Sequence, residues 1–220
     1  MNKFIAFWRS SIGKKIIMSL SGLFLCTFLI VHVSANLFLF KRDGGETYNE
    51  VAHFMSSNLA IRITEVVLFI GIVAHMISGV VVWMKNWLSR PVRYEMYSLK
   101  DNTPFSSRRP MLTTSAGLVG FFLVSHLTTF WIPTRFGAEP KPPYQMVSEA
   151  FSDPVLSIFY IIAVAFLAFH LKHGFQSGFQ TLGLNNKKYK PLIDAFAIIF
   201  WLIIPLAFAA MPAYFLWFKS

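Results

Sequence analysis

Five long stretches of this chain are almost free of charged side chains, and each is long enough to cross a lipid bilayer. A membrane-spanning helix needs about 20 mainly apolar residues, and the stretches cover residues 16–40, 62–84, 110–134, 154–183 and 192–218. The first and the third contain no Asp, Glu, Lys or Arg. The sequence therefore predicts an all-α polytopic membrane protein in which residues 1–220 form one domain with five transmembrane helices.

The composition excludes several other classes of protein. Hydrophobic residues make up 55% of the chain and charged residues 14%, whereas soluble domains are near 45–50% apolar and about 25% charged. The chain has a single cysteine, Cys26, so an internal disulfide, an iron–sulfur cluster and a cysteine-based zinc site are excluded. The net charge of +10 would suggest nucleic acid in a soluble protein, but in a membrane protein the placement of the charges indicates orientation instead.

The basic residues predict which ends of the helices face the cytoplasm. If the N-terminus is inside, 14 of the 20 Lys and Arg residues lie in inner segments and seven of the ten acidic residues lie in outer ones. Cytoplasmic loops carry such an excess of Lys and Arg. We therefore expect a cytoplasmic N-terminus in a multi-pass protein of the cytoplasmic (inner) membrane. The basic inner surface would face lipid headgroups or a docked cytoplasmic partner.

Four histidines lie within the predicted spans, one on each of the first four helices. His32 and His126 each lie 17 residues after a basic residue at the inner end and 9 before one at the outer end. At 1.5 Å per residue, both lie roughly 13 Å from the outer charged boundary. His170 lies two residues before Lys172, and His75 lies near the middle of its helix and slightly inward. The depths thus predict an outer pair, His32 with His126, and an inner pair, His75 with His170.

Two imidazoles that face each other at one depth are the axial ligand set of a six-coordinate haem. Neutral imidazole suits iron, and no carboxylate or cysteine accompanies the pairs to indicate zinc or a di-iron centre. His173 lies on nearly the same helix face as His170 and is the alternative inner ligand, although its place beyond Lys172 favours an interfacial position. Small residues that would let a flat macrocycle approach the backbone, or simply let helices pack, are Gly22, Gly71, Gly79, Gly117, Gly120 and Gly174.

Two sequence strings at these histidines resemble a known family. IGKKIIMSLSGLF begins at Ile12 and is followed by FLIVH ending at His32, and FHLKHGF surrounds His170 and continues to QTLG ending at Gly183. Together they resemble the cytochrome b subunit of succinate dehydrogenase and fumarate reductase, in its single-polypeptide, five-helix, dihaem form (the b558 family). His75 and Gly79 repeat the His-x-x-x-Gly spacing in the second span.

The resemblance implies a function that composition alone could not. Such subunits bind two haem b groups and anchor a flavoprotein subunit and an iron–sulfur subunit on the cytoplasmic face of the membrane. They carry electrons between those subunits and a membrane quinone, for which menaquinone is the expected type. His32 and His126 would hold the haem distal from the soluble subunits, and His75 and His170 the proximal haem. No residue is assigned to the quinone, and Glu50 and His53 near the outer end are candidates only.

The chain departs from the family at one position, and it has no motif for the oxidation of succinate. Some two-haem members carry a glutamate, linked to proton movement, two residues before the fourth-span ligand, where this chain has Ala168. With no dinucleotide-binding fingerprint and too few cysteines for clusters, we expect no succinate site here, only an electron-transfer and quinone-reactive subunit. Two rivals remain: the bis-histidine cytochrome b anchor of another respiratory oxidoreductase with partners on the outer face, and a transporter whose histidines relay protons.

Overall fold

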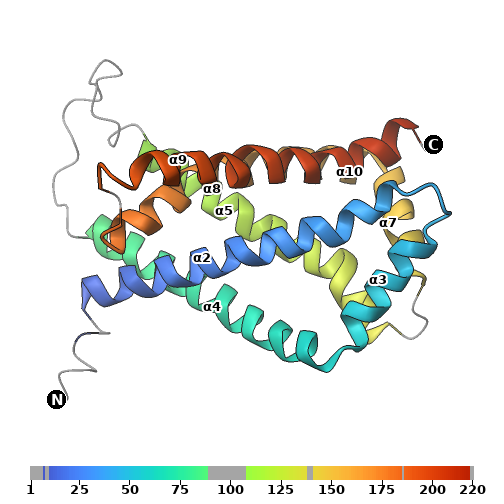
Figure 1. The fold of residues 1–220 in the computed structure, drawn as a ribbon, viewed down its shortest axis with the longest axis horizontal. Coiled ribbons are helices and arrows are strands. Elements are labelled where there is room, and N and C mark those ends of the chain that lie inside the picture. The colour runs from blue at the N-terminus through green and yellow to red at the C-terminus, as the bar shows by residue number, and fades with distance from the viewer. Residues whose placement is uncertain (1–6, 8–9, 89–107, 138–140, 185, 219–220) are drawn as a thin grey trace.

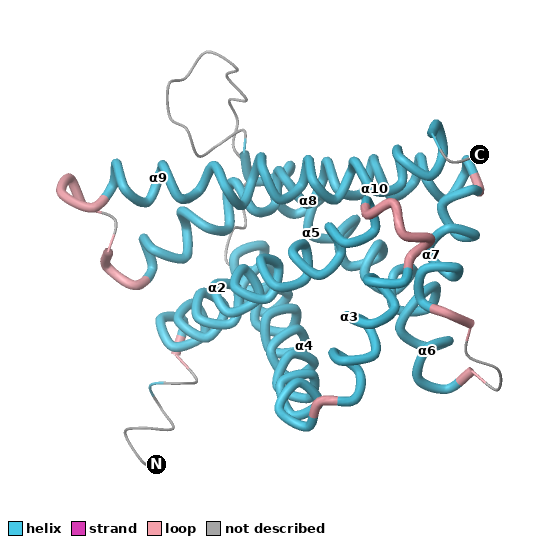
Figure 2. Tube along the Cα trace, turned by 45° about the vertical axis from the view of Figure 1, so that its right-hand side comes forward, coloured by secondary structure: helices cyan, strands magenta, loops and turns pink. Residues whose placement is uncertain are grey.

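The computed structural model describes residues 7, 10–88, 108–137, 141–184 and 186–218. The described chain is almost entirely helical (Figure 2). Much of the predicted basic segment between the second and third spans, including Arg90, Arg93 and Lys100, lies outside the described residues.

Five helical spans are long and apolar enough to cross a membrane, which confirms the predicted fold class. They run along the long axis of the molecule (Figure 1). Their elements are α2 (Ser11–Asn36) with η1 (Leu37–Phe40); α4 (Leu59–Leu88); α5 (Arg108–His126) with η2 (Leu127–Trp131) and α6 (Ile132–Phe136); α8 (Pro154–Thr181); and α9 (Lys190–Ile198) with η3 (Ile199–Ile203) and α10 (Ile204–Phe218).

Two of the spans begin at residues whose side chains cap the helix. The Ser10 hydroxyl accepts a hydrogen bond from the Gly13 N–H at 3.1 Å, so α2 begins five residues before the predicted span. The Asp153 carboxylate accepts from the Val155 N–H at 2.8 Å at the start of α8. That helix ends at Thr181, two residues before Gly183, whose φ of 76° is the left-handed conformation that glycine tolerates.

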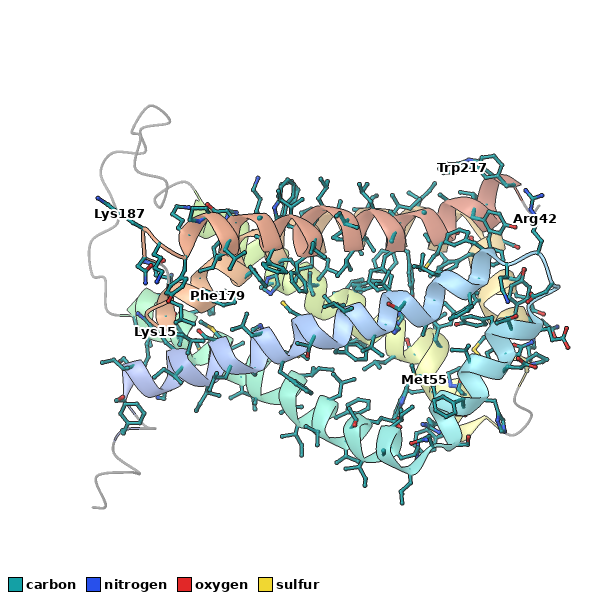
Figure 3. The ribbon with its side chains drawn as sticks, in the orientation of Figure 1. Lys15, Arg42, Met55, Phe179, Lys187 and Trp217 are labelled. Atoms are coloured by element: carbon teal, nitrogen blue, oxygen red, sulfur yellow. The ribbon has the colours of Figure 1, made fainter. Side chains whose placement is uncertain are left out.

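Two short amphipathic helices close one end of the bundle. These are α3 (Glu46–Ser57) and α7 (Pro143–Ser152); α7 lies beside the C-terminal end of α10, and α3 lies beside α7 (Figure 1). The Tyr144 backbone N–H donates to the Asn49 side-chain oxygen at 2.9 Å and joins the two helices. We call this the outer end, after the predicted orientation, and the end where α2 begins the inner end. Lys15 and Lys187 lie at the inner end, and Arg42 and Trp217 at the outer end (Figure 3).

Two of the spans contain a wider π-helical turn, and each turn precedes a proline. η2 ends two residues before Pro133, and η3 ends two residues before Pro205. A proline ring clashes with the carbonyl four residues earlier in an α-helix, and here that carbonyl belongs to Thr129 or Trp201, inside the π turn. The wider turn therefore accommodates both prolines without ending the span.

The buried core lies between α8, α10 and α2. The side of α4 that faces away from this core is exposed and apolar. Tyr160, Phe175 and Phe215 are among the buried core residues. Val66, Ile70 and Val73 on α4 are all more than half exposed. A water-exposed helix would carry polar residues there, so this face is suited to contact lipid.

Candidate metal centres

A large apolar cavity runs between the spans and contains all four intramembrane histidines. Its volume is about 3200 Å³, and it reaches from Lys15 at the inner end to Tyr48 at the outer end. An ordinary small-molecule pocket measures roughly 300–1,000 Å³. The cavity is therefore large enough for more than one sizeable ligand.

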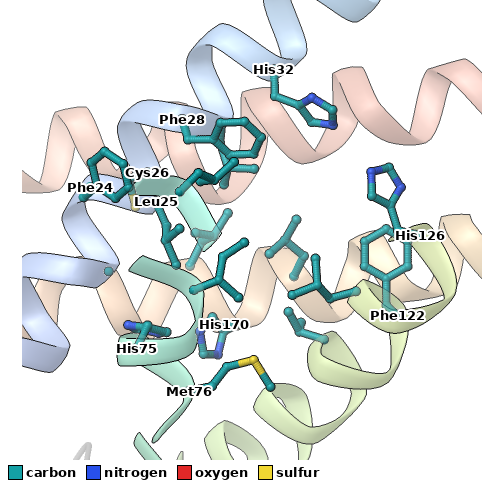
Figure 4. A pocket seen from close by; sticks show the side chains of 18 of the residues that line it. Phe24, Leu25, Cys26, Phe28, His32, His75, Met76, Phe122, His126 and His170 are labelled. Atoms are coloured by element: carbon teal, nitrogen blue, oxygen red, sulfur yellow. The ribbon is translucent and has the colours of Figure 1, made fainter. Parts of the chain in front are cut away.

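The outer pair faces across this cavity from two helices. His32 on α2 and His126 at the end of α5 have ring centroids 5.7 Å apart, with ring planes at 87°. Figure 4 shows the two side chains extending toward each other. Phe28 stacks on the His32 ring at 5.2 Å, and Phe122 and Phe130 pack beside His126. Both imidazoles are thus held among aromatic rings at one depth.

The inner pair has almost the same geometry. His75 on α4 and His170 on α8 have ring centroids 6.2 Å apart, with ring planes at 88°, and the rings lie close together in Figure 4. The structure thus brings together in space the same two pairs that the depths along the sequence predicted. Their role as metal ligands stays a prediction.

The separation within each pair fits a metal ion bound from both sides. A metal–imidazole nitrogen bond is about 2 Å long, and the nitrogen lies about 1 Å from its ring centre, so two axial imidazoles place their centroids roughly 6 Å apart. Among the described residues, no group of three or more His, Cys, Asp or Glu could hold a metal ion. Two-ligand sites fit a metal whose remaining ligands come from a macrocycle, as in haem.

The second ring nitrogens show how the protein would orient these ligands. The His75 Nδ1 lies 3.1 Å from the Met18 carbonyl oxygen. Because a carbonyl can only accept, Nδ1 carries the proton and Nε2 remains available for a metal. Among described atoms, the buried Nδ1 atoms of His126 and His170 have no hydrogen-bond partner. Buried polar atoms are normally paired, so these two nitrogens lack the kind of partner that the Met18 carbonyl gives to His75.

A short hydrogen-bond chain connects the outer pair to the helices that close the bundle. The Asn36 amide nitrogen donates to the His32 carbonyl at 2.8 Å and lies 3.4 Å from the His32 Nδ1. The Tyr48 hydroxyl donates to the Asn36 side-chain oxygen at 3.2 Å. Burial raises the pKa of Tyr48 to about 12, which keeps this hydroxyl protonated as a donor. α3 therefore helps to position Asn36 and, through it, His32.

Several glycines leave space in the cavity that a side chain would fill. A Cβ on Gly79, Gly117 or Gly174 would meet no atom within 4 Å, and all three glycines line the cavity. A Cβ on Gly22 would lie 3.0 Å from the Cε1 of His75, so this glycine lets that ring pack against α2. Gly71 instead packs against the Phe24 ring, as in ordinary helix packing.

The remaining sequence candidates lie away from the paired rings. His173 lines the cavity next to the inner pair, but it is His170 whose ring faces His75. Glu50 and His53 are exposed on α3. Sequence reasoning missed a polar cluster at the outer end, where Trp131 and Arg135 donate to the Glu65 carboxylate at 2.7 Å each. Its signal was Glu65 itself, an acid within an apolar stretch.

Comparison with known proteins gives one curated relative. The chain is 26% identical over 196 residues to the succinate dehydrogenase cytochrome b558 subunit of Bacillus subtilis (strain 168), covering 86% of this chain and 87% of that protein. The resemblance to the b558 family is confirmed. No family model and no solved structure matches the chain. The b558 relative and the five spans together support a multi-pass membrane protein.

Proposed function

We propose that this chain is the dihaem cytochrome b subunit that anchors a succinate:quinone oxidoreductase to the membrane and carries electrons between its iron–sulfur subunit and quinone. The observation that carries the proposal is the presence of two histidine pairs, with centroids 5.7 Å and 6.2 Å apart, in one apolar cavity. The b558 relative, which is named as a subunit of succinate dehydrogenase, supports the choice of complex.

The residues of this chain would hold and insulate two haem b groups. His32 with His126 would hold the outer one, and His75 with His170 the inner one. Bound haem would supply one-electron redox chemistry, and holding each haem by two histidines would suit electron transfer rather than binding of a further ligand. The cavity wall is mostly apolar, and the Met18 carbonyl orients His75.

The positive charge at the inner end supports the proposed side of the membrane for the soluble partners. Lys15 and Lys187 lie at the inner end, which supports a cytoplasmic N-terminus and docking of the flavoprotein and iron–sulfur subunits there. Succinate would be oxidised, or fumarate reduced, on the flavoprotein subunit. A membrane quinone, with menaquinone the expected type, would exchange electrons with this chain.

A reduced-minus-oxidised visible spectrum, with haem quantified per polypeptide, tests the proposal. The chain purified in its complex is expected to contain two b-type haems and to co-purify with a succinate-oxidising flavoprotein. Absence of haem from the assembled protein would contradict the proposal and favour a histidine proton relay. Two haems with a soluble partner on the outer face would instead favour the anchor of a different respiratory oxidoreductase.

A further inference from the structure

Three donor side chains converge on one carboxylate at the outer end of the cavity. Glu65 on α4 accepts from the Trp131 indole N–H at 2.7 Å and from the Arg135 Nη2 at 2.7 Å and Nε at 3.3 Å. The Arg62 Nη1 also donates to Glu65, at 2.8 Å. Glu65, Trp131 and Arg135 line the same cavity as the four histidines. We call these four residues the outer cluster.

The outer cluster carries a surplus positive charge. It combines two guanidinium groups with one carboxylate, and the side chains of Arg135 and Glu65 are only 20% and 18% exposed, whereas Arg62 is 44% exposed. Charge within a membrane is costly unless it is compensated. Glu65 occupies two of the three guanidinium nitrogens of Arg135. Arg135 thus keeps a cationic nitrogen that Glu65 does not pair with, on a side chain that lines the cavity.

The π turn η2 brings two members of the cluster, Trp131 and Arg135, toward the helix face of His126. In an α-helix, Trp131 would be rotated by about 140° from His126, because five residues separate them at 3.6 per turn. A π turn contains one extra residue, and η2 spans Leu127–Trp131. Trp131 is thereby brought close to the position directly above His126, and Arg135 follows one turn later. All three side chains line the cavity.

We propose that the outer cluster is a carboxylate-binding subsite that receives a propionate of the haem held by His32 and His126 and raises the reduction potential of that haem. This inference rests on the proposed function. A haem carries two carboxylates, which need cationic partners in apolar surroundings. Arg135 supplies the cation, while Glu65 and Trp131 fix its orientation. Glu65 also moderates the positive potential that acts on the haem.

The two charges of the cluster should shift the potential of the outer haem in opposite directions. Arg135→Gln removes a positive charge, so reduction of that haem becomes less favourable and its potential falls. Glu65→Gln removes the opposing negative charge, so the potential rises. For a unit charge about 10 Å away at an effective dielectric constant near 20, the reduced-to-oxidised ratio at a fixed ambient potential changes on the order of tenfold. The inner haem should shift far less, because it lies farther away.

The experiment is a spectroscopic redox titration of both haems in the whole complex, comparing the parent with Arg135→Gln, Arg135→Lys, Glu65→Gln and Arg62→Gln. Arg62→Gln removes the other cation of the cluster, at a more exposed position, so it should lower the outer potential less than Arg135→Gln does. Arg135→Lys keeps the charge and should retain most of the parent potential. Loss of the outer haem in Arg135→Gln alone, with a raised potential in Glu65→Gln, also supports the subsite.

Three results would overturn the inference. The first is a shift of the same sign in Arg135→Gln and Glu65→Gln, and the second is loss of the outer haem in both, since either would mean that the cluster only clamps α4 to α6. The third is an unchanged outer potential in all variants. Any of these in a parent protein with two haems would leave the proposed function standing. A parent without haem would instead contradict the proposed function itself.

Discussion

Replacing His32 or His126 with alanine is expected to reduce the haem content from two per chain to one and to leave the inner haem in place. The rings of His32 and His126 face each other with centroids 5.7 Å apart. Loss of either would remove one of the two proposed ligands of the outer haem. The inner pair is formed by α4 and α8, and neither His75 nor His170 contacts the outer rings in the described structure. The low-temperature visible spectrum should lose the bands of one haem, and redox titration should show a single remaining step.

An exposed histidine provides the control for this experiment. His53 lies on α3 at the outer end and is exposed, so His53→Ala should keep both haems and both redox steps. Matching substitutions of His75 or His170 should remove the other haem. If both haems survived in His32→Ala and in His126→Ala, the proposed ligand pairing would be wrong.

Much of the fold could be predicted from the sequence because a membrane restricts what a chain can form. Backbone groups in lipid must be satisfied internally, so an apolar stretch of sufficient length forms a helix. Since helices rise by a constant 1.5 Å per residue, the distance of each histidine from the flanking charges gave its depth. Depth alone was enough to group His32 with His126, because these positions match to the residue at both ends.

Several features of the candidate site could not be predicted, because they depend on tertiary contacts that leave no periodic pattern in the sequence. The Met18 carbonyl meets His75 across two helices, 57 positions apart in the sequence. The hydrogen bonds from Trp131 and Arg135 to Glu65 join residues about 70 positions apart, next to a π turn that helical periodicity does not predict. The closing helices α3 and α7 are too short and too polar to appear as spans, yet Tyr48 on α3 connects to His32 through Asn36.

Replacing Gly22 should disturb the inner haem as strongly as replacing one of the proposed ligands, although Gly22 binds no metal itself. A Cβ at this position would lie 3.0 Å from the Cε1 and 3.3 Å from the Nδ1 of His75, closer than side chains normally pack. The His75 Nδ1 is held against the same helix by its hydrogen bond to the Met18 carbonyl, so the ring cannot move away from α2 without breaking that bond. We therefore expect Gly22→Val to push His75 out of line with His170 and to lose the inner haem, and Gly22→Ala to lower its occupancy or shift its potential.

The matched control for this substitution is another glycine of the same cavity. A Cβ on Gly178 would lie 3.6 Å from Leu23, an ordinary van der Waals contact, so Gly178→Ala should keep both haems with unchanged potentials. Haem per polypeptide and a redox titration of each variant provide the measurement. Because Gly22 faces His75 rather than the outer pair, the outer haem should persist in Gly22→Val and show that the chain has folded. An inner haem at full occupancy and parental potential in Gly22→Val would mean that α2 does not hold His75 in place. The inner site would then depend on α4 and α8 alone.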